Sequence, residues 1–155
     1  MERYASGILC FLVLGIVGCG DDGLKSPTAL RMSGLANSYL DMSYQGGPPA
    51  NEDALKKHMG AMHPGEQYSR NIDSKNIDAC FKSERDNEPL VVVYGIKPEI
   101  SGQSKQVIAH EKTGKNGKRL VVFASTKVAS VSEAELEQLK SAKPSDKDKK
   151  ETDKK

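Results

Sequence analysis

The chain has no tryptophan, only three phenylalanines and three cysteines, and no marked excess of either charge. Its 23 Lys and Arg residues against 21 Asp and Glu residues give a net charge of +2, which excludes the strongly basic surface of a dedicated nucleic-acid binder. At 155 residues the chain is too short for a large multidomain enzyme. Its 14 glycines and 7 prolines are ordinary usage, so collagen-like and low-complexity classes are also excluded. We therefore expect one small domain and no nucleic-acid partner.

A long apolar run is missing as well. The apolar stretch near the start, residues 7–18, has only 12 residues, whereas a membrane-spanning helix needs about 20. Arg3 precedes this stretch, and Gly20 and Asp21 follow soon after it. A short polar head before an apolar run is the pattern of a signal peptide. We therefore expect residues 1–18 to be removed from the mature protein.

The end of this stretch, Ile16-Val17-Gly18-Cys19, resembles a bacterial lipobox, in which small residues before the cysteine admit the lipoprotein signal peptidase. The resemblance implies that Cys19 becomes the lipidated first residue of the mature chain. The protein would then be held in the cell envelope, in the outer membrane or on the periplasmic face of the inner membrane, with residues 19–26 as a flexible lipidated tether. The alternatives are an ordinary signal peptide that contains Cys10 and Cys19, or a buried core helix.

This prediction determines how many free cysteine thiols the mature chain has. Cys10 leaves with the signal and lipid occupies the Cys19 sulfur, so Cys80 becomes the one free thiol of the mature chain. No intramolecular disulfide is then available to the fold. Cys80 is either a small apolar core residue or a reactive or intermolecularly pairing thiol. Because no histidine lies close to it in sequence, the core interpretation is favoured.

The C-terminal residues 140–155 form a lysine-rich segment with seven lysines, four acidic residues and Ala142 as the only apolar residue. Such a segment cannot bury enough apolar surface to offset chain ordering, so it is predicted to be disordered. It is either a solvated spacer or a contact for anionic lipid or wall polymer. Without this tail and the signal, residues 19–139 carry a net charge of −1. The single folded domain is predicted to be residues 27–139.

Two helices are predicted in the first half of the domain. Ser26 as a cap followed by Pro27 starts a helix over residues 27–45. Its apolar stripe is expected to be Leu30, Leu35, Tyr39 and Met42. A shorter helix starts after the Asn51 cap and ends near Gly60. From 61 to 88 the pattern is weak, with one turn of helix around residues 75–81.

The second half is predicted to be a β-meander and a terminal helix. The β-branched runs are residues 89–94, 106–111, 119–124 and 128–131. Asn116-Gly117 suits a tight hairpin turn, and the short loops make the strands antiparallel. Ser132 and Glu135 form a capping box for a helix over 133–140, with Val131 and Leu136 as a hydrophobic staple. The fold class is therefore α+β: the N-terminal helix packs on one face of a three- to four-stranded antiparallel meander, followed by a short C-terminal helix.

Several segments together resemble small uncharacterised lipoproteins of planctomycete-type bacteria. These segments are residues 35–40, 47–52, 55–58, 89–95, 108–111 and 118–119. The family that they imply has no assigned activity. More distantly, a helix followed by a meander, with Phe123-Ala124 before a turn and Val128 after it, is similar to the globular part of type II secretion pseudopilins. The chain has Ser125-Thr126 where those proteins commonly carry Asp-Gly, and it lacks their prepilin cleavage motif. An accessory role in a type II secretion or pilus-like system is thus one alternative function.

The densest cluster of metal-ligating side chains is His58, Met59, Met62 and His63. Imidazole nitrogen and thioether sulfur suit copper, so periplasmic copper handling is a second alternative function. The two histidines are five residues apart, which does not place them on one helix face. The other interpretation is a histidine at a helix end, a histidine in a loop and two core methionines.

Signatures of catalysis are missing. No Gly-x-Ser-x-Gly elbow and no neighbouring Cys-His pair occurs, and the carboxylates are expected on polar faces, with none embedded in an apolar run. Residues 114–118 resemble a phosphate loop only superficially and are a hairpin turn. His110 stands alone in a strand with Glu111 on the opposite face, as a packed or surface residue. We expect no catalytic residue and no cofactor. The predicted function is a non-enzymatic binding or structural module whose partners are the membrane and an unidentified envelope protein.

Overall fold

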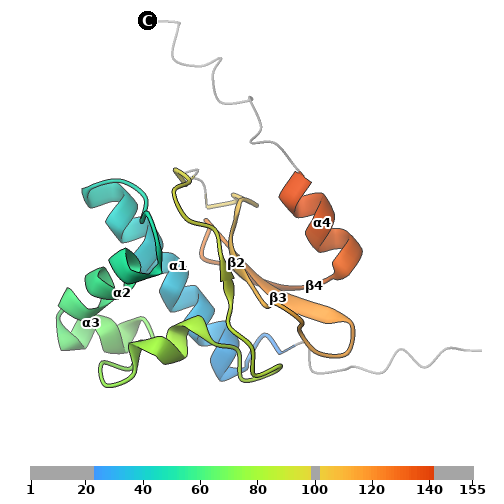
Figure 1. The fold of residues 1–155 in the computed structure, drawn as a ribbon, viewed down its shortest axis with the longest axis horizontal. Coiled ribbons are helices and arrows are strands. Elements are labelled where there is room, and N and C mark those ends of the chain that lie inside the picture. The colour runs from blue at the N-terminus through green and yellow to red at the C-terminus, as the bar shows by residue number, and fades with distance from the viewer. Residues whose placement is uncertain (1–22, 99–101, 142–155) are drawn as a thin grey trace, which may run out of the picture.

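The computed structural model describes residues 23–98 and 102–141, so Cys19, the signal segment and most of the lysine-rich tail lie outside the described residues. Four α-helices, one 3-10 helix and four strands make up these ranges (Figure 1). In chain order they are α1 (Pro27–Gln45), α2 (Glu52–Ala61), α3 (Pro64–Ser69), η1 (Ile77–Phe81), β1 (Val91–Val92), β2 (Val107–His110), β3 (Lys118–Phe123), β4 (Val128–Ser132) and α4 (Glu133–Ser141). Within the described ranges, no helix combines the length and the apolar character needed to cross a bilayer.

The sheet has the order β1-β2-β3-β4 with every neighbouring pair antiparallel, which confirms the predicted meander and the α+β class. The helices α1 and α4 lie on opposite sides of it (Figure 1). Side chains alternate between the two faces along β3: Leu120 and Val122 join the core that contains α1, whereas Val121 packs with Leu136 of α4. The C-terminal helix therefore adds a partial third layer to the two layers that the sequence predicts.

Helix α1 begins at the predicted cap, because the Ser26 hydroxyl accepts a hydrogen bond from the Ala29 N–H at 3.2 Å. Its buried apolar side chains are Ala29, Met32, Leu35, Ala36 and Tyr39. Leu30, predicted in the buried stripe, is 48% exposed, so that prediction is wrong for Leu30. The sheet and η1 pack against the face centred on Leu35, and Leu30 lies outside that face.

The predicted hairpin turn is confirmed. Asn116 and Gly117 both have positive φ, 55° and 71°, and the Lys115 and Lys118 backbones exchange hydrogen bonds of 2.9 and 3.0 Å. The first strand is shorter than predicted, although the Val93 N–H directly after it still donates to the Ile108 carbonyl of β2 at 2.9 Å. The Leu90 and Gly95 N–H groups bond outside the sheet. The Leu90 N–H donates to the Phe81 carbonyl, and the Gly95 N–H donates to the Pro49 carbonyl.

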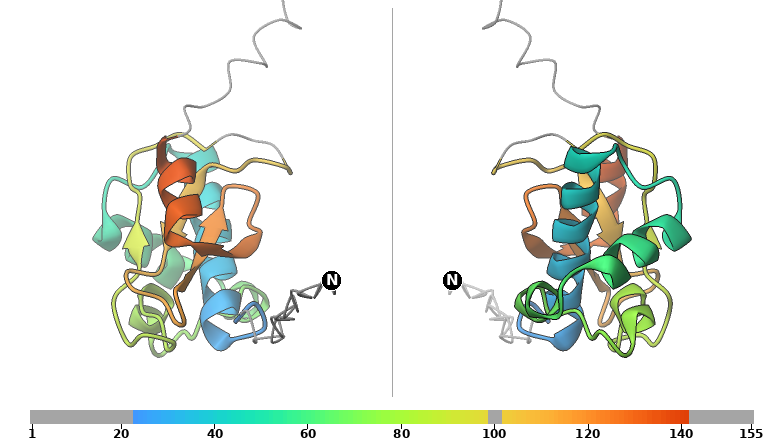
Figure 2. Two further views of the ribbon diagram at one scale, coloured as in Figure 1. Left: turned by 90° about the vertical axis from the view of Figure 1, so that its right-hand side faces the viewer. Right: turned by 90° about the vertical axis from the view of Figure 1, so that its left-hand side faces the viewer.

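The weakly patterned middle of the chain contains one helix that the sequence pattern misses, α3, and the expected turn of helix, which is η1. The helix α3 begins at Pro64, and the His63 ring nitrogen Nδ1 accepts a hydrogen bond from the Gly65 N–H. The terminal capping box is confirmed, because the Ser132 N–H donates to the Glu135 carboxylate at 2.7 Å. Two views at right angles to Figure 1 show α1 and the later strands packed in one body (Figure 2).

Candidate functional site

The described chain begins at Gly23, four residues after the predicted lipid site at Cys19. Residues 23–26, which the sequence assigns to the tether, form a turn in which the Ser26 N–H donates to the Gly23 carbonyl at 3.0 Å. Gly23 has a φ of +73° and lies against Arg85, so that a Cβ at this position would come within 2.8 Å of the guanidinium. The first described residues therefore already pack on the body, and residues 20–22 separate them in sequence from Cys19.

His58, the first residue of the predicted copper cluster, lies near the end of α2 and faces α1. Its Nε2 is 3.0 Å from the Asp41 carboxylate, and Arg70 lies 3.8 Å from the same carboxylate. Both side chains of the His58–Asp41 pair are less than a third exposed. This pair ties α2 to α1 through Nε2 of the His58 ring.

The other three members of the cluster have separate surroundings. Met59 is fully buried and Met62 is 9% exposed, and both belong to the main core. His63 is exposed and caps α3. Among residues 23–98 and 102–141, no group of three or more His, Cys, Asp or Glu side chains is arranged to hold a metal ion. The structure therefore places His58 in a contact with Asp41, Met59 and Met62 in the core, and His63 at a helix cap.

Cys80 lies in η1 and is 1% exposed, within the main core. Burial raises the pKa of its thiol above the ordinary value, and the weaker influence of the Arg31 cation in the opposite direction does not overcome this. The thiol is thus protonated near neutral pH and shielded from reagents. This environment agrees with the prediction that Cys80 is a core residue.

The sequence pattern misses one buried charge, Glu111, which directly follows β2 and is fully buried. The expectation that no carboxylate is embedded among apolar residues is therefore wrong for Glu111. Its carboxylate accepts hydrogen bonds from the Ser83 hydroxyl at 2.6 Å and the Leu120 N–H at 2.8 Å, and pairs with Arg85 at 2.9 Å. Its position shortly after the apolar run 107–109 is the sequence signal that could have indicated its burial. With three donors around it, Glu111 joins the loop before β1 to the sheet.

Asp86 provides a second set of contacts between the loop before β1 and the rest of the fold. Its Oδ2 accepts hydrogen bonds from the Thr113 and Gly114 N–H groups at 3.1 and 2.6 Å, and its Oδ1 accepts one from the Glu88 N–H at 3.1 Å. Partial burial alone would raise the pKa of Asp86, but the hydrogen bonds favour the charged form and hold the pKa below its usual value. Asp86 therefore stays ionised and fastens the loop to the β2–β3 hairpin.

His110 is 4% exposed, so of its two predicted placements, packed or on the surface, it has the packed one. Its Nδ1 donates to the Glu111 carbonyl at 2.8 Å, so this ring nitrogen carries a proton. Burial lowers the pKa of His110, and the positive charges of Lys140 and Arg119 lower it further. His110 is thus a neutral packed residue at physiological pH.

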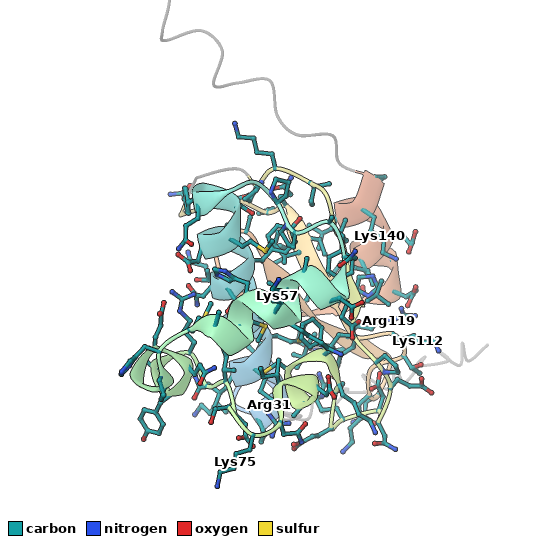
Figure 3. All side chains as sticks on the ribbon, turned by 60° about the vertical axis from the view of Figure 1, so that its left-hand side comes forward. Arg31, Lys57, Lys75, Lys112, Arg119 and Lys140 are labelled. Atoms are coloured by element: carbon teal, nitrogen blue, oxygen red, sulfur yellow. The ribbon has the colours of Figure 1, made fainter. Side chains whose placement is uncertain are left out.

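The cationic side chains are spread over the body. Figure 3 shows the labelled residues from Lys75 at its lower end to Lys140 toward its upper end, with Lys57 between them. Several cations are paired with neighbouring carboxylates: Arg31 with Glu84, Lys112 with Glu88, Arg119 with Glu133, and Lys140 with Glu137. Such a distribution gives the described part of the chain a surface on which cations and carboxylates are interspersed.

Comparison of the chain with protein-family models, with curated proteins and with solved structures finds no match in any of the three.

Proposed function

We propose that this protein is a bacterial envelope lipoprotein, attached to a membrane through lipid on Cys19, whose folded body serves as a non-enzymatic binding or structural module. The observation that carries the proposal is the motif Ile16-Val17-Gly18-Cys19 at the end of the apolar run 7–18. The resemblance to small planctomycete-type lipoproteins points in the same direction.

The start of the folded body supports this assignment. Among the described residues, a hydrogen-bonded turn is already present at residues 23–26, a few residues after the predicted lipid site in sequence. The buried polar groups described above are engaged within the fold: Glu111 with Arg85, and His110 with a backbone carbonyl. A body whose reactive groups are used internally suits a module that acts through its surface.

The proposal is tested by substituting each cysteine of the signal region in a diderm bacterial host. Cys19→Ser should remain unprocessed or become soluble. It should no longer incorporate labelled palmitate, and it should no longer partition into the detergent phase. Cys10→Ser is the matched control, because Cys10 is removed with the signal and its loss should change none of these properties.

Membrane attachment and palmitate labelling that persist in Cys19→Ser would overturn the proposal. Fractionation of the wild-type protein on a density gradient would then assign the lipidated form to the inner or the outer membrane. Crosslinking of intact envelopes, followed by identification of the captured proteins, would show whether the body has a protein partner.

A further inference from the structure

Two leucines are exposed at the end of the body where the chain arrives from Cys19. Leu24, in the turn before α1, is 43% exposed, and Leu30, in the first turns of α1, is 48% exposed. These are the exposed leucines of the described ranges. Lys25, also exposed, lies between them in sequence. We call Leu24, Lys25 and Leu30 the entry face.

The entry face lies close to the predicted lipid site because the connection is short. Four residue steps from Cys19 to Gly23 reach at most about 14 Å even when fully extended. Leu24 is the next residue, and the turn of residues 23–26 connects it directly to α1. An acyl chain embedded in a bilayer would therefore hold the entry face near the lipid headgroups.

The rest of the body extends away from this end. The first turn of α1 and the end of α4 lie at opposite ends of the body (Figures 1 and 2). Tyr44, which is 60% exposed, lies near the other end of α1, 14 residues from Leu30, or about 21 Å along the helix axis. In Figure 3, Arg31 and Lys75 lie toward the lower end and Lys140 toward the upper end.

We propose that the entry face docks on the bilayer that holds the Cys19 lipid, with Leu24 and Leu30 in the interfacial region and Lys25 at the level of the phosphates. This inference rests on the proposed function, since the lipid supplies the attachment. Two leucines bury too little apolar surface to bind a membrane alone. Once the lipid holds them at the surface, their high effective concentration makes the contact favourable. The docked body stands with α1 rising from the membrane and Ser141 remote from it.

The test uses the full lipidated chain in vesicles of phosphatidylcholine and phosphatidylglycerol, labelled with an environment-sensitive maleimide fluorophore. Lipidation occupies Cys19 and burial shields Cys80, so label goes to one introduced cysteine. Leu30→Cys reports on the entry face, and Tyr44→Cys is the matched control on the same helix. Vesicles with a nitroxide near the headgroup of some lipids quench fluorophores that contact the interface.

We expect quenching at position 30 to be several-fold stronger than at position 44. Adding Leu24→Ser to the Leu30→Cys protein should lower the quenching at position 30 toward the value at position 44. Equal quenching at both positions, or no effect of Leu24→Ser, would overturn the docking and indicate free tumbling on the tether. A label at position 30 that is shielded from water but not quenched would also overturn it, in favour of a second copy or another protein on this face.

Mass analysis of the N-terminal fragment distinguishes a failure of the proposed function from a failure of the docking alone. A fragment without lipid on Cys19 contradicts the proposed function and the docking together. A lipidated fragment with equal quenching at both positions contradicts the docking alone. Because Leu24 and Leu30 are exposed, we expect their variants to keep the wild-type circular dichroism spectrum.

Discussion

Removing the Glu111 carboxylate should strongly destabilise the body. Glu111 is fully buried, and the side chain of its partner Arg85 is only 11% exposed. In Glu111→Ala the guanidinium keeps its charge without a counter-ion, and the Ser83 hydroxyl and Leu120 N–H lose their acceptor. Breaking a buried ion pair by removing one partner costs about 3–5 kcal/mol.

The stability lost in Glu111→Ala is large relative to the free energy of unfolding of the whole domain. A domain of 116 described residues has a free energy of unfolding of about 6–17 kcal/mol. With a urea slope of about 1.5 kcal/mol/M, a loss of 4 kcal/mol lowers the urea midpoint by about 2–3 M. Replacing both partners by methionine removes the unpaired charge, so the double variant Glu111→Met/Arg85→Met should cost much less than the sum of the single variants.

The measurement is urea unfolding of the mature chain, followed by circular dichroism. Glu88→Ala is the control, because the Glu88–Lys112 pair is exposed and its loss should cost less than about 1 kcal/mol. A cost below about 1 kcal/mol for Glu111→Ala, or additive effects in the double-variant cycle, would refute the view that this pair is a buried, coupled contact.

Two further predictions concern packing and pH. In Gly34→Ala the new Cβ would stand 1.9 Å from the Arg70 carbonyl oxygen, so α1 must move away, and we expect a loss of about 1–3 kcal/mol in urea unfolding. Gly46→Ala, which has open space around it, should change stability by less than about 0.5 kcal/mol, and equal effects of the two variants would contradict the close approach. Burial lowers the pKa of His110, so between the unfolded value of about 6.5 and the lower folded pKa the unfolded chain binds more protons, and stability falls as the pH drops below about 6.5. His110→Gln, which cannot titrate, should show a flatter unfolding free energy between pH 7 and pH 5, and a slope equal to that of the wild type would count against this reasoning.

The parts of the fold that could be predicted are those with local signals. The Ser26 cap, the Asn116-Gly117 turn and the Ser132/Glu135 box each act over four residues or fewer, and each is found where the pattern predicts it. The helix α3 was missed because it is only six residues long and Gln67 is its one buried side chain, so it has no apolar period.

The features that could not be predicted depend on tertiary contacts. Glu111 is buried because Ser83 and Arg85 lie against it, 28 and 26 positions away in sequence. His58 is engaged by Asp41, 17 positions away, and no spacing within residues 58–63 contains that information. The exposure of Leu30 depends on which side of α1 the sheet occupies. Helical periodicity gives a stripe, but the packing decides which of its members are covered.

The loop before β1 has a mechanical consequence for an anchored protein. Under the proposed lipidation, a pull on Cys19 would reach Gly23, the first described residue, which lies against Arg85 of this loop. The loop is bonded to the first turn of α1, because the Glu84 N–H donates to the Thr28 hydroxyl, and it is bonded to the sheet through Glu111. Under the proposed attachment at Cys19, tension on the lipid would spread into both the helix and the sheet. The proposed point of attachment would then lie close to the contacts that join these layers, so a load at the membrane would be resisted by helix and sheet together.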